Sequence, residues 1–203
     1  MKSLTLTFSL IRQFIYLVLL TLIVVIFWQV ADAFKASTVQ EYGIFESAQS
    51  IVLFLTAISF IIQSIINKAY RPVLFSLGML ALAALVREQD AYFDTLIPLI
   101  GWRWCWFFPL LGLALIIHKW RETVARLPHF LQCNSFHMMM TALVIIIPVA
   151  QCLGHRSFLA DMIGEQGVDT HLVRRLVEEP IELLGYIQIL LASIESMFDL
   201  RKK

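Results

Sequence analysis

The sequence predicts an all-α protein: a polytopic membrane bundle of six transmembrane helices with one short amphipathic surface helix. Its 203 residues are 59% hydrophobic and only 15% charged, whereas a soluble domain carries roughly 25% charged residues. The apolar residues gather in six stretches of about the length that crosses a bilayer, which is roughly 20 residues. Most charged residues stand between or at the ends of these stretches. Composition, segment length and charge placement therefore agree on a protein that lives in the lipid bilayer.

The six apolar stretches define the predicted spans. They lie near residues 13–31, 44–66, 72–91, 103–119, 136–153 and 180–199. No connecting segment is long enough for a separate folded domain, so we expect a single integral membrane domain over residues 1–203. The third span is the least typical, because its apolar part is short and charged residues follow it directly. Pro109 and Pro148 stand inside the fourth and fifth spans, where proline kinks a helix.

The two ends of the chain each need an interpretation. Lys2 and Arg12 precede the first apolar run, and Ala31-Asp32-Ala33 resembles a signal-peptide cleavage site. We interpret this run as a retained anchor, because it is long for a signal peptide. Before the last span, four apolar residues recur at helical spacing and predict the amphipathic surface helix: Leu172, Val173, Leu176 and Val177. Pro180 is predicted to separate that helix from the last span.

The basic residues predict the orientation. Of the 16 lysines and arginines, ten fall on the side that carries both termini, and an excess of basic residues marks the cytoplasmic side. We therefore expect both termini in the cytoplasm, in a bacterial inner membrane. Most acidic residues then fall on the outer side. The net charge of +1 provides no basic surface for nucleic acid, so the predicted partners are the lipid bilayer and, as an open alternative, another membrane protein.

Acidic residues recur at the outer ends of the second, third and sixth spans. If these spans adjoin, their carboxylates share one outward-facing polar cleft, and ionisable residues inside a membrane protein are functional candidates. The candidate catalytic residues are Glu46, Glu88, Asp90 and Glu182. One would act as a general base and another as an acid. The alternative interpretation is structural, because acids also stabilise helix N-termini and small polar residues pack helices together.

Polar and basic neighbours of these acids are candidates for substrate binding. Gln49 and Ser50 share the helix side of Glu46, and Tyr186 stands one turn beyond Glu182. Arg87 and Arg103 are also candidates for substrate binding, or they would neutralise the acids and make the site structural.

Clustered carboxylates share protons or recruit a cation, so a divalent metal ion is a candidate cofactor. The candidate ligands are Glu46, Glu88, Glu178, Glu182 and His155. An oxygen-rich set suits Mg²⁺, Ca²⁺ or Mn²⁺, and adding His155 would permit Zn²⁺ or Fe²⁺. Glu178 and Glu182 are four residues apart, so they face one point if the helix continues through Pro180.

One stretch resembles a known family. Glu46-Ser47-Ala48-Gln49-Ser50 resembles the start of an early helix in the alkaline-ceramidase group of seven-helix membrane hydrolases. That group uses a His-x-x-x-His pair late in the chain, and Glu178 and Glu182 stand nearest to that place here. No activity is carried over from the resemblance.

Three functions are compatible with the sequence. The first is a membrane-embedded hydrolase or transferase that acts on a lipid-linked or small substrate in the carboxylate-lined cleft. The second is a non-catalytic membrane subunit or assembly factor, in which small and polar residues along the second and sixth spans only pack helices together. The third is a cation- or proton-coupled transporter.

Overall fold

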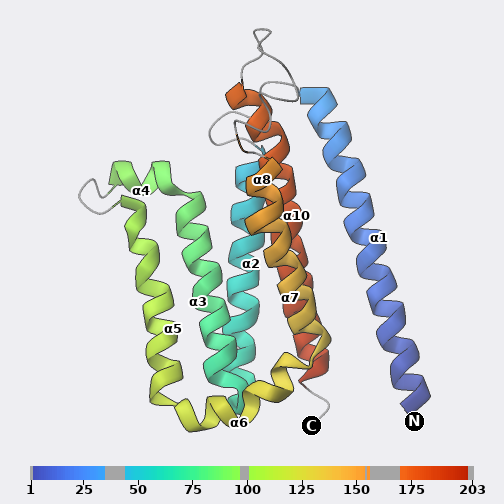
Figure 1. Ribbon diagram of the computed structural model, residues 1–203, viewed down its shortest axis with the longest axis vertical. Helices are drawn as coiled ribbons and strands as arrows, with labels where there is room; N and C mark the ends of the chain where they lie inside the picture. The colour runs from blue at the N-terminus through green and yellow to red at the C-terminus, as the bar shows by residue number, and fades with distance from the viewer. Residues whose placement is uncertain (1, 35–43, 97–100, 154, 156–169, 201–203) are drawn as a thin grey trace.

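The computed structural model describes residues 2–34, 44–96, 101–153, 155 and 170–200. The described residues form a helical bundle without strands, so the predicted all-α class is confirmed. Most of the long helices run side by side (Figure 1). In chain order the elements are α1 (Lys2–Phe34), α2 (Ile44–Ile66), the 3₁₀ turn η2 (Lys68–Tyr70), α3 (Arg71–Glu88), α4 (Asp90–Leu96), the 3₁₀ segment η3 (Gly101–Trp106), α5 (Phe107–His118), α6 (Trp120–Leu131), α7 (Asn134–Val144), the π-helical segment η4 (Ile145–Ala150), α8 (Gln151–Leu153) and α10 (Thr170–Asp199).

Five segments of the described chain are long and apolar enough to cross a membrane. They are Thr7–Phe27, Ile44–Ile66, Lys68–Glu88, Asn134–Leu153 and Val177–Asp199. Each overlaps one of the predicted spans, and the second coincides with its prediction. The protein is therefore built as an integral membrane protein. Its outward apolar side chains fit this setting, because lipid favours the exposure that water would penalise.

The fourth predicted span, 103–119, is divided between two elements. The α-helix α5 has only 12 residues and follows the six-residue 3₁₀ segment η3. At 1.5 and 2.0 Å per residue, the two together reach about 30 Å, close to the thickness of the hydrocarbon core. Pro109 stands in the first turn of α5, where its missing N–H costs no helical hydrogen bond. Whether residues 103–119 form a sixth span thus stays a prediction.

The predicted break at Pro180 is wrong. Helix α10 continues through Pro180 from Thr170 to Asp199, so residues 170–179 are not a separate surface helix. A proline inside a helix removes one backbone hydrogen bond, but Glu179 and Leu183 are buried on either side of it. Packing on both sides holds the two parts of the helix in line. Among the helices that the structure describes, α6 is amphipathic and lies across one end of the bundle (Figure 1).

The core lies between α2, α3, α7 and α10, with α1 at one edge and α5 at the other (Figure 1). Small residues allow close helix approach, as where Gly112 of α5 meets Ser76 of α3. The start of α1, the end of α10 and α6 lie at one end of the bundle, which we call the α6 end. The opposite end carries α4 and is called the α4 end.

Candidate functional site

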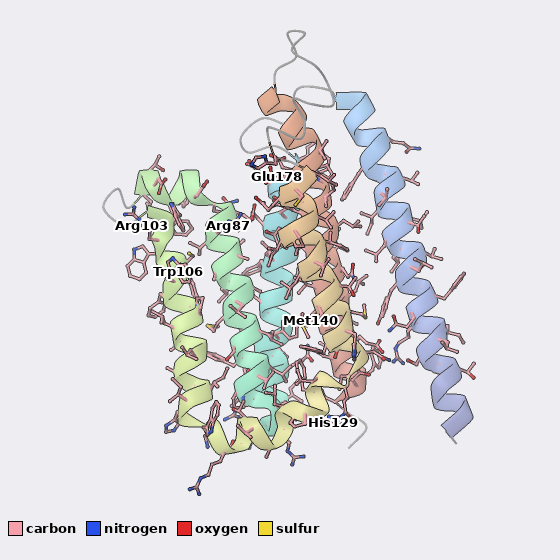
Figure 2. The ribbon with its side chains drawn as sticks, in the orientation of Figure 1. Arg87, Arg103, Trp106, His129, Met140 and Glu178 are labelled. Carbon is pink, nitrogen blue, oxygen red and sulfur yellow. The ribbon has the colours of Figure 1, made fainter. Side chains whose placement is uncertain are left out.

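The candidate site lies at the α4 end, where α3 ends at Glu88 and α2 begins at Ile44. Figure 2 shows Arg87 and Glu178 at this end, on α3 and α10. The direction in which each helix runs explains why these acids gather at one end. Helices α2 and α10 run away from this end and α3 runs toward it, so acids at their near termini reach a common depth.

A hydrogen bond between α10 and α3 anchors the site. The hydroxyl group of Tyr186 donates to Oε1 of Glu88 at 2.7 Å. Tyr186 is buried and packs in an apolar cluster with Leu53 of α2 and Ile146 of η4. This apolar support holds the hydroxyl in place, and hydrogen bonds to a charged carboxylate are stronger than those between neutral groups.

A single amide joins the two acids that flank Pro180. Nε2 of Gln151 donates to Oε1 of Glu178 at 2.8 Å and to Oε1 of Glu182 at 3.1 Å. Glu178 and Glu182 therefore face one point, as expected for a helix that continues through the proline. Both side chains are buried. The continuity of α10 is thus what pairs these carboxylates.

Acids of the four helices α2, α3, α4 and α10 lie close enough to interact electrostatically. Glu88 interacts with Glu46 and Asp90, and Glu182 interacts with Glu88 and Glu178. The guanidinium group of Arg87 interacts with both Glu88 and Glu182. Arg87 therefore offsets part of the negative charge at this end.

On α2, the amide group of Gln49 and the hydroxyl group of Ser50 differ in their hydrogen bonds. Nε2 of Gln49 donates to the backbone carbonyl of Glu179 at 3.1 Å, while its Oε1 has no hydrogen-bond partner within the described residues. Ser50 donates to the carbonyl oxygen of Glu46 at 2.9 Å and accepts from Nε2 of Gln89 at 2.7 Å. Gln49 thus offers a buried acceptor, and the hydroxyl group of Ser50 is occupied by one bond within α2 and one from Gln89.

Two candidates stand apart from this group. Arg103 is exposed on η3, which packs against α3, α4 and α5 and not against α10. In Figure 2, Arg87 lies between Arg103 and Glu178. His155 is exposed just beyond α8, and its backbone N–H donates to the carbonyl of Cys152 at 3.3 Å.

The proposed metal ligands do not form a ready coordination shell. Within the part of the chain that the structure describes, no three His, Cys, Asp or Glu side chains are grouped so as to hold a metal ion. Glu88 is bonded to Tyr186, and Glu178 and Glu182 share Gln151. The arrangement fits hydrogen-bonded acids, and metal binding by Glu46, Glu88, Glu178, Glu182 and His155 stays a prediction.

A cleft lies on the other side of Arg87, between the end of α3 and η3–α5. Its volume is about 610 Å³. It is lined by Ala83, Ala84, Arg87, Asp90, Trp102, Cys105, Trp106 and Pro109. Arg87 and Asp90, both predicted as site residues, therefore border a space large enough for a small molecule.

Sequence reasoning missed three polar contributors. Neither Gln89 nor Gln151 carries a charge: Gln89 stands between Glu88 and Asp90, and Gln151 stands among apolar residues. Glu195, in the last predicted span, is fully buried. Arg12 donates to it from Nε at 2.9 Å and from Nη2 at 2.6 Å. The sequence feature that could have indicated this pair is Arg12, a basic residue at the edge of the first apolar run.

Polar side chains of α2 and α10 form hydrogen bonds with each other nearer the α6 end of the bundle. Gln63 donates to the backbone carbonyl of Ser193 at 2.9 Å, and Ser196 donates to Oε1 of Gln63. These groups pack helices together, which is the structural interpretation of these polar residues.

Comparison with known proteins adds no relative: no family model matches the chain, and no significant match is found among curated proteins or solved structures. The geometry of the site is therefore the basis for its function.

Proposed function

We propose that the protein is a membrane-embedded hydrolase or transferase that acts on a lipid-linked or small substrate at the α4 end. The observation that carries the proposal is the bond from Tyr186 to Glu88, next to the Glu178–Gln151–Glu182 bridge. Buried acids in a membrane bundle are costly, and their presence favours a functional role.

The hydrogen bonds divide the roles among the acids. Glu88 accepts from a hydroxyl group, so we assign it as the general base that removes a proton from water or from an acceptor hydroxyl. Glu182 instead shares one amide donor, Nε2 of Gln151, with Glu178. We assign Glu182 as the general acid that returns a proton to the leaving group. Opposite roles for neighbouring carboxylates require different surroundings, which these partners provide.

Two further residues support binding. Oε1 of Gln49 is a buried acceptor without a hydrogen-bond partner in the described chain, and a substrate N–H or O–H would satisfy it. Burying an unmet polar atom costs about 1–3 kcal/mol, so a donor from the substrate would recover part of this cost. Arg87, which interacts with both Glu88 and Glu182, would bind a negatively charged group beside the reacting bond.

The proposal is tested by incubating the purified protein with the lipid extract of its expression host and following product formation by mass spectrometry. We expect Glu88→Gln and Glu182→Gln each to lower product formation at least about 100-fold, the usual contribution of acid–base catalysis. Glutamine keeps an oxygen that can accept from Tyr186 or Gln151, so the fold should survive. Glu122→Gln, an exposed glutamate on α6, is the matched control and should keep full activity. Wild-type product levels in both site variants would refute the assignment.

Transport is a second candidate, because α10 carries buried acids at two depths. Glu182 lies near the α4 end, and Glu195 lies thirteen positions further along the same helix. Intramembrane acids also mark proton and cation routes. Proteoliposomes loaded with a pH-sensitive dye distinguish the two candidates. Proton or cation flux that both Glu182→Gln and Glu195→Gln abolish would favour transport over catalysis.

A further inference from the structure

The cleft between α3 and η3–α5 combines a charged rim with an apolar interior. Ala83 and Ala84 form the α3 wall, and Cys105, Trp106 and Pro109 form the opposite wall. Below it, α3 and α5 meet directly, because the hydroxyl group of Ser76 donates to the carbonyl of Gly112 at 2.9 Å. The volume of about 610 Å³ lies in the range of small-ligand sites, roughly 300–1,000 Å³.

The indole rings indicate the depth of this cleft in the membrane. Trp102 and Trp106 line it, and both side chains are exposed. Tryptophan is enriched where the hydrocarbon core meets the headgroups, because its ring is apolar and its N–H is polar. The mouth of the cleft is therefore expected at headgroup level, with the alanine and proline walls facing the acyl region.

Arg87 joins this cleft to the candidate catalytic acids. Arg87 borders the cleft, and Cys105 lies on its far wall. The guanidinium group of Arg87 interacts with Glu88 and Glu182 on the α10 side. Arg87 thus stands between an anion held in the cleft and the acids Glu88 and Glu182, neither of which lines the cleft. Asp90, which also lines the cleft, disfavours a second negative charge there.

We propose that this cleft binds an anionic phosphodiester lipid, with its phosphate on Arg87 and one acyl chain along the apolar walls. Arginine recognises phosphate through two parallel hydrogen bonds. Asp90 favours a singly charged phosphodiester over a phosphomonoester. This inference rests on the proposed function in naming its substrate class, but lipid binding can be measured without turnover.

Tryptophan quenching by brominated lipids tests the proposal directly. In the full-length protein, Trp28, Trp104 and Trp120 are replaced by Phe, which leaves Trp102 and Trp106 as reporters in the cleft. We expect brominated phosphatidylglycerol in mild detergent to quench them at an about tenfold lower mole fraction than brominated phosphatidylcholine. That factor corresponds to one charge-assisted contact. A protein that keeps only Trp120, on α6, should show no preference between the two lipids.

Substitutions assign the preference to Arg87. We expect Arg87→Gln to abolish it and Arg87→Lys to keep part of it, while Arg121→Gln, exposed on α6, leaves it intact. Arg87 is exposed, so these variants should fold, which size-exclusion profiles verify. Equal quenching by both lipids, or a preference that survives Arg87→Gln, would overturn the proposal. Soluble glycerol phosphate should not relieve the quenching; if it does, the headgroup alone is the ligand and the lipid site is wrong.

The same assay separates the two proposals. Glu182→Gln should keep the lipid preference, because Glu182 does not line the cleft. If the preference is present but no lipid is converted, the lipid site stands and the enzymatic function fails. If a non-lipid substrate is converted and the preference is absent, the enzymatic function stands and the lipid site fails.

Discussion

Glu195 and Arg12 form a bidentate ion pair that connects the first helix, α1, to the last, α10. The Glu195 side chain is fully buried, and the Arg12 side chain is 21% exposed. Tyr16 adds a third donor to Glu195 at 3.1 Å, and the guanidinium group of Arg12 stands 4.5 Å from the ring centre of Phe198. Most of the α1 surface is apolar and exposed, so it faces lipid and gives little packing energy. We infer that this polar contact holds α1 on the bundle.

Removing one partner of a buried ion pair leaves the other charge uncompensated. We expect Arg12→Met to lower the free energy of unfolding by about 3 kcal/mol, the lower end of the range for buried pairs, because Arg12 is partly exposed. Unfolding of the purified protein in mixed micelles measures the change. Replacing both residues, Arg12→Met with Glu195→Met, should recover much of the loss.

The exposed pair Lys119–Glu122 provides the matched comparison. Its side chains are 42% and 53% exposed, and surface pairs contribute less than about 1 kcal/mol. Lys119→Met should therefore change the stability little. Similar losses for Arg12→Met and Lys119→Met would show that the buried pair is not a specific attachment point.

At the level of elements, the continuity of α10 and the close approach of α5 to α3 shape the site. Because α10 continues through Pro180, Glu178 and Glu182 share the Gln151 amide. On the opposite side, Gly112 brings α5 so near that an added Cβ would lie 3.0 Å from the Cα of Ser76. The walls of the lipid cleft depend on this contact, because it holds η3–α5 beside the end of α3.

A larger side chain at Gly112 should separate α5 from α3, because the atoms it meets belong to the backbone as well as the side chain of Ser76. We expect Gly112→Val to lower the free energy of unfolding by about 1–3 kcal/mol, as is typical of overpacking. Heat-induced unfolding in detergent checks this. Ala114→Val, at an exposed position of the same helix, should be nearly neutral, and an equal effect of both changes would contradict the packing argument.

At the level of the whole molecule, the arrangement of charges predicts which face meets the cytoplasm. The start of α1 and the end of α10 both lie at the α6 end (Figure 1). This agrees with a topology in which both termini are on the same side of the membrane. The excess of basic residues predicts that this end is cytoplasmic. The candidate site and the lipid cleft, at the α4 end, would then open to the outer side.

Thiol labelling of intact cells tests this orientation. Cys152 is exposed near the α4 end, so a protein with Cys105→Ser and Cys133→Ser should react with a membrane-impermeant maleimide from outside. In a cysteine-free background, Glu122→Cys on α6 should react only after the membrane is permeabilised. The reverse pattern would invert the predicted topology and place the candidate site on the cytoplasmic face.

Much of the fold follows from local patterns, and the candidate site follows in part. Apolar runs of membrane length predicted the class, and the segment 44–66 became α2 without change. The acidic ends of three helices led to Glu88 and Glu182, and helical spacing led to Tyr186. The helices and their shared faces can be predicted because hydropathy and the helical period depend on a residue and its near neighbours. The roles of Glu88, Glu182 and Tyr186 stay predictions.

The partners of these residues required the tertiary structure. Neither the choice of Gln151 as the amide between two acids, nor the pairing of Arg12 with Glu195, follows from sequence spacing. Such contacts depend on which helices are neighbours and how each is rotated about its axis. The helix through Pro180 shows the same limit, because burial on both sides outweighed the local preference of proline to end a helix. Local chemistry therefore specified the elements, and packing between distant segments specified the site.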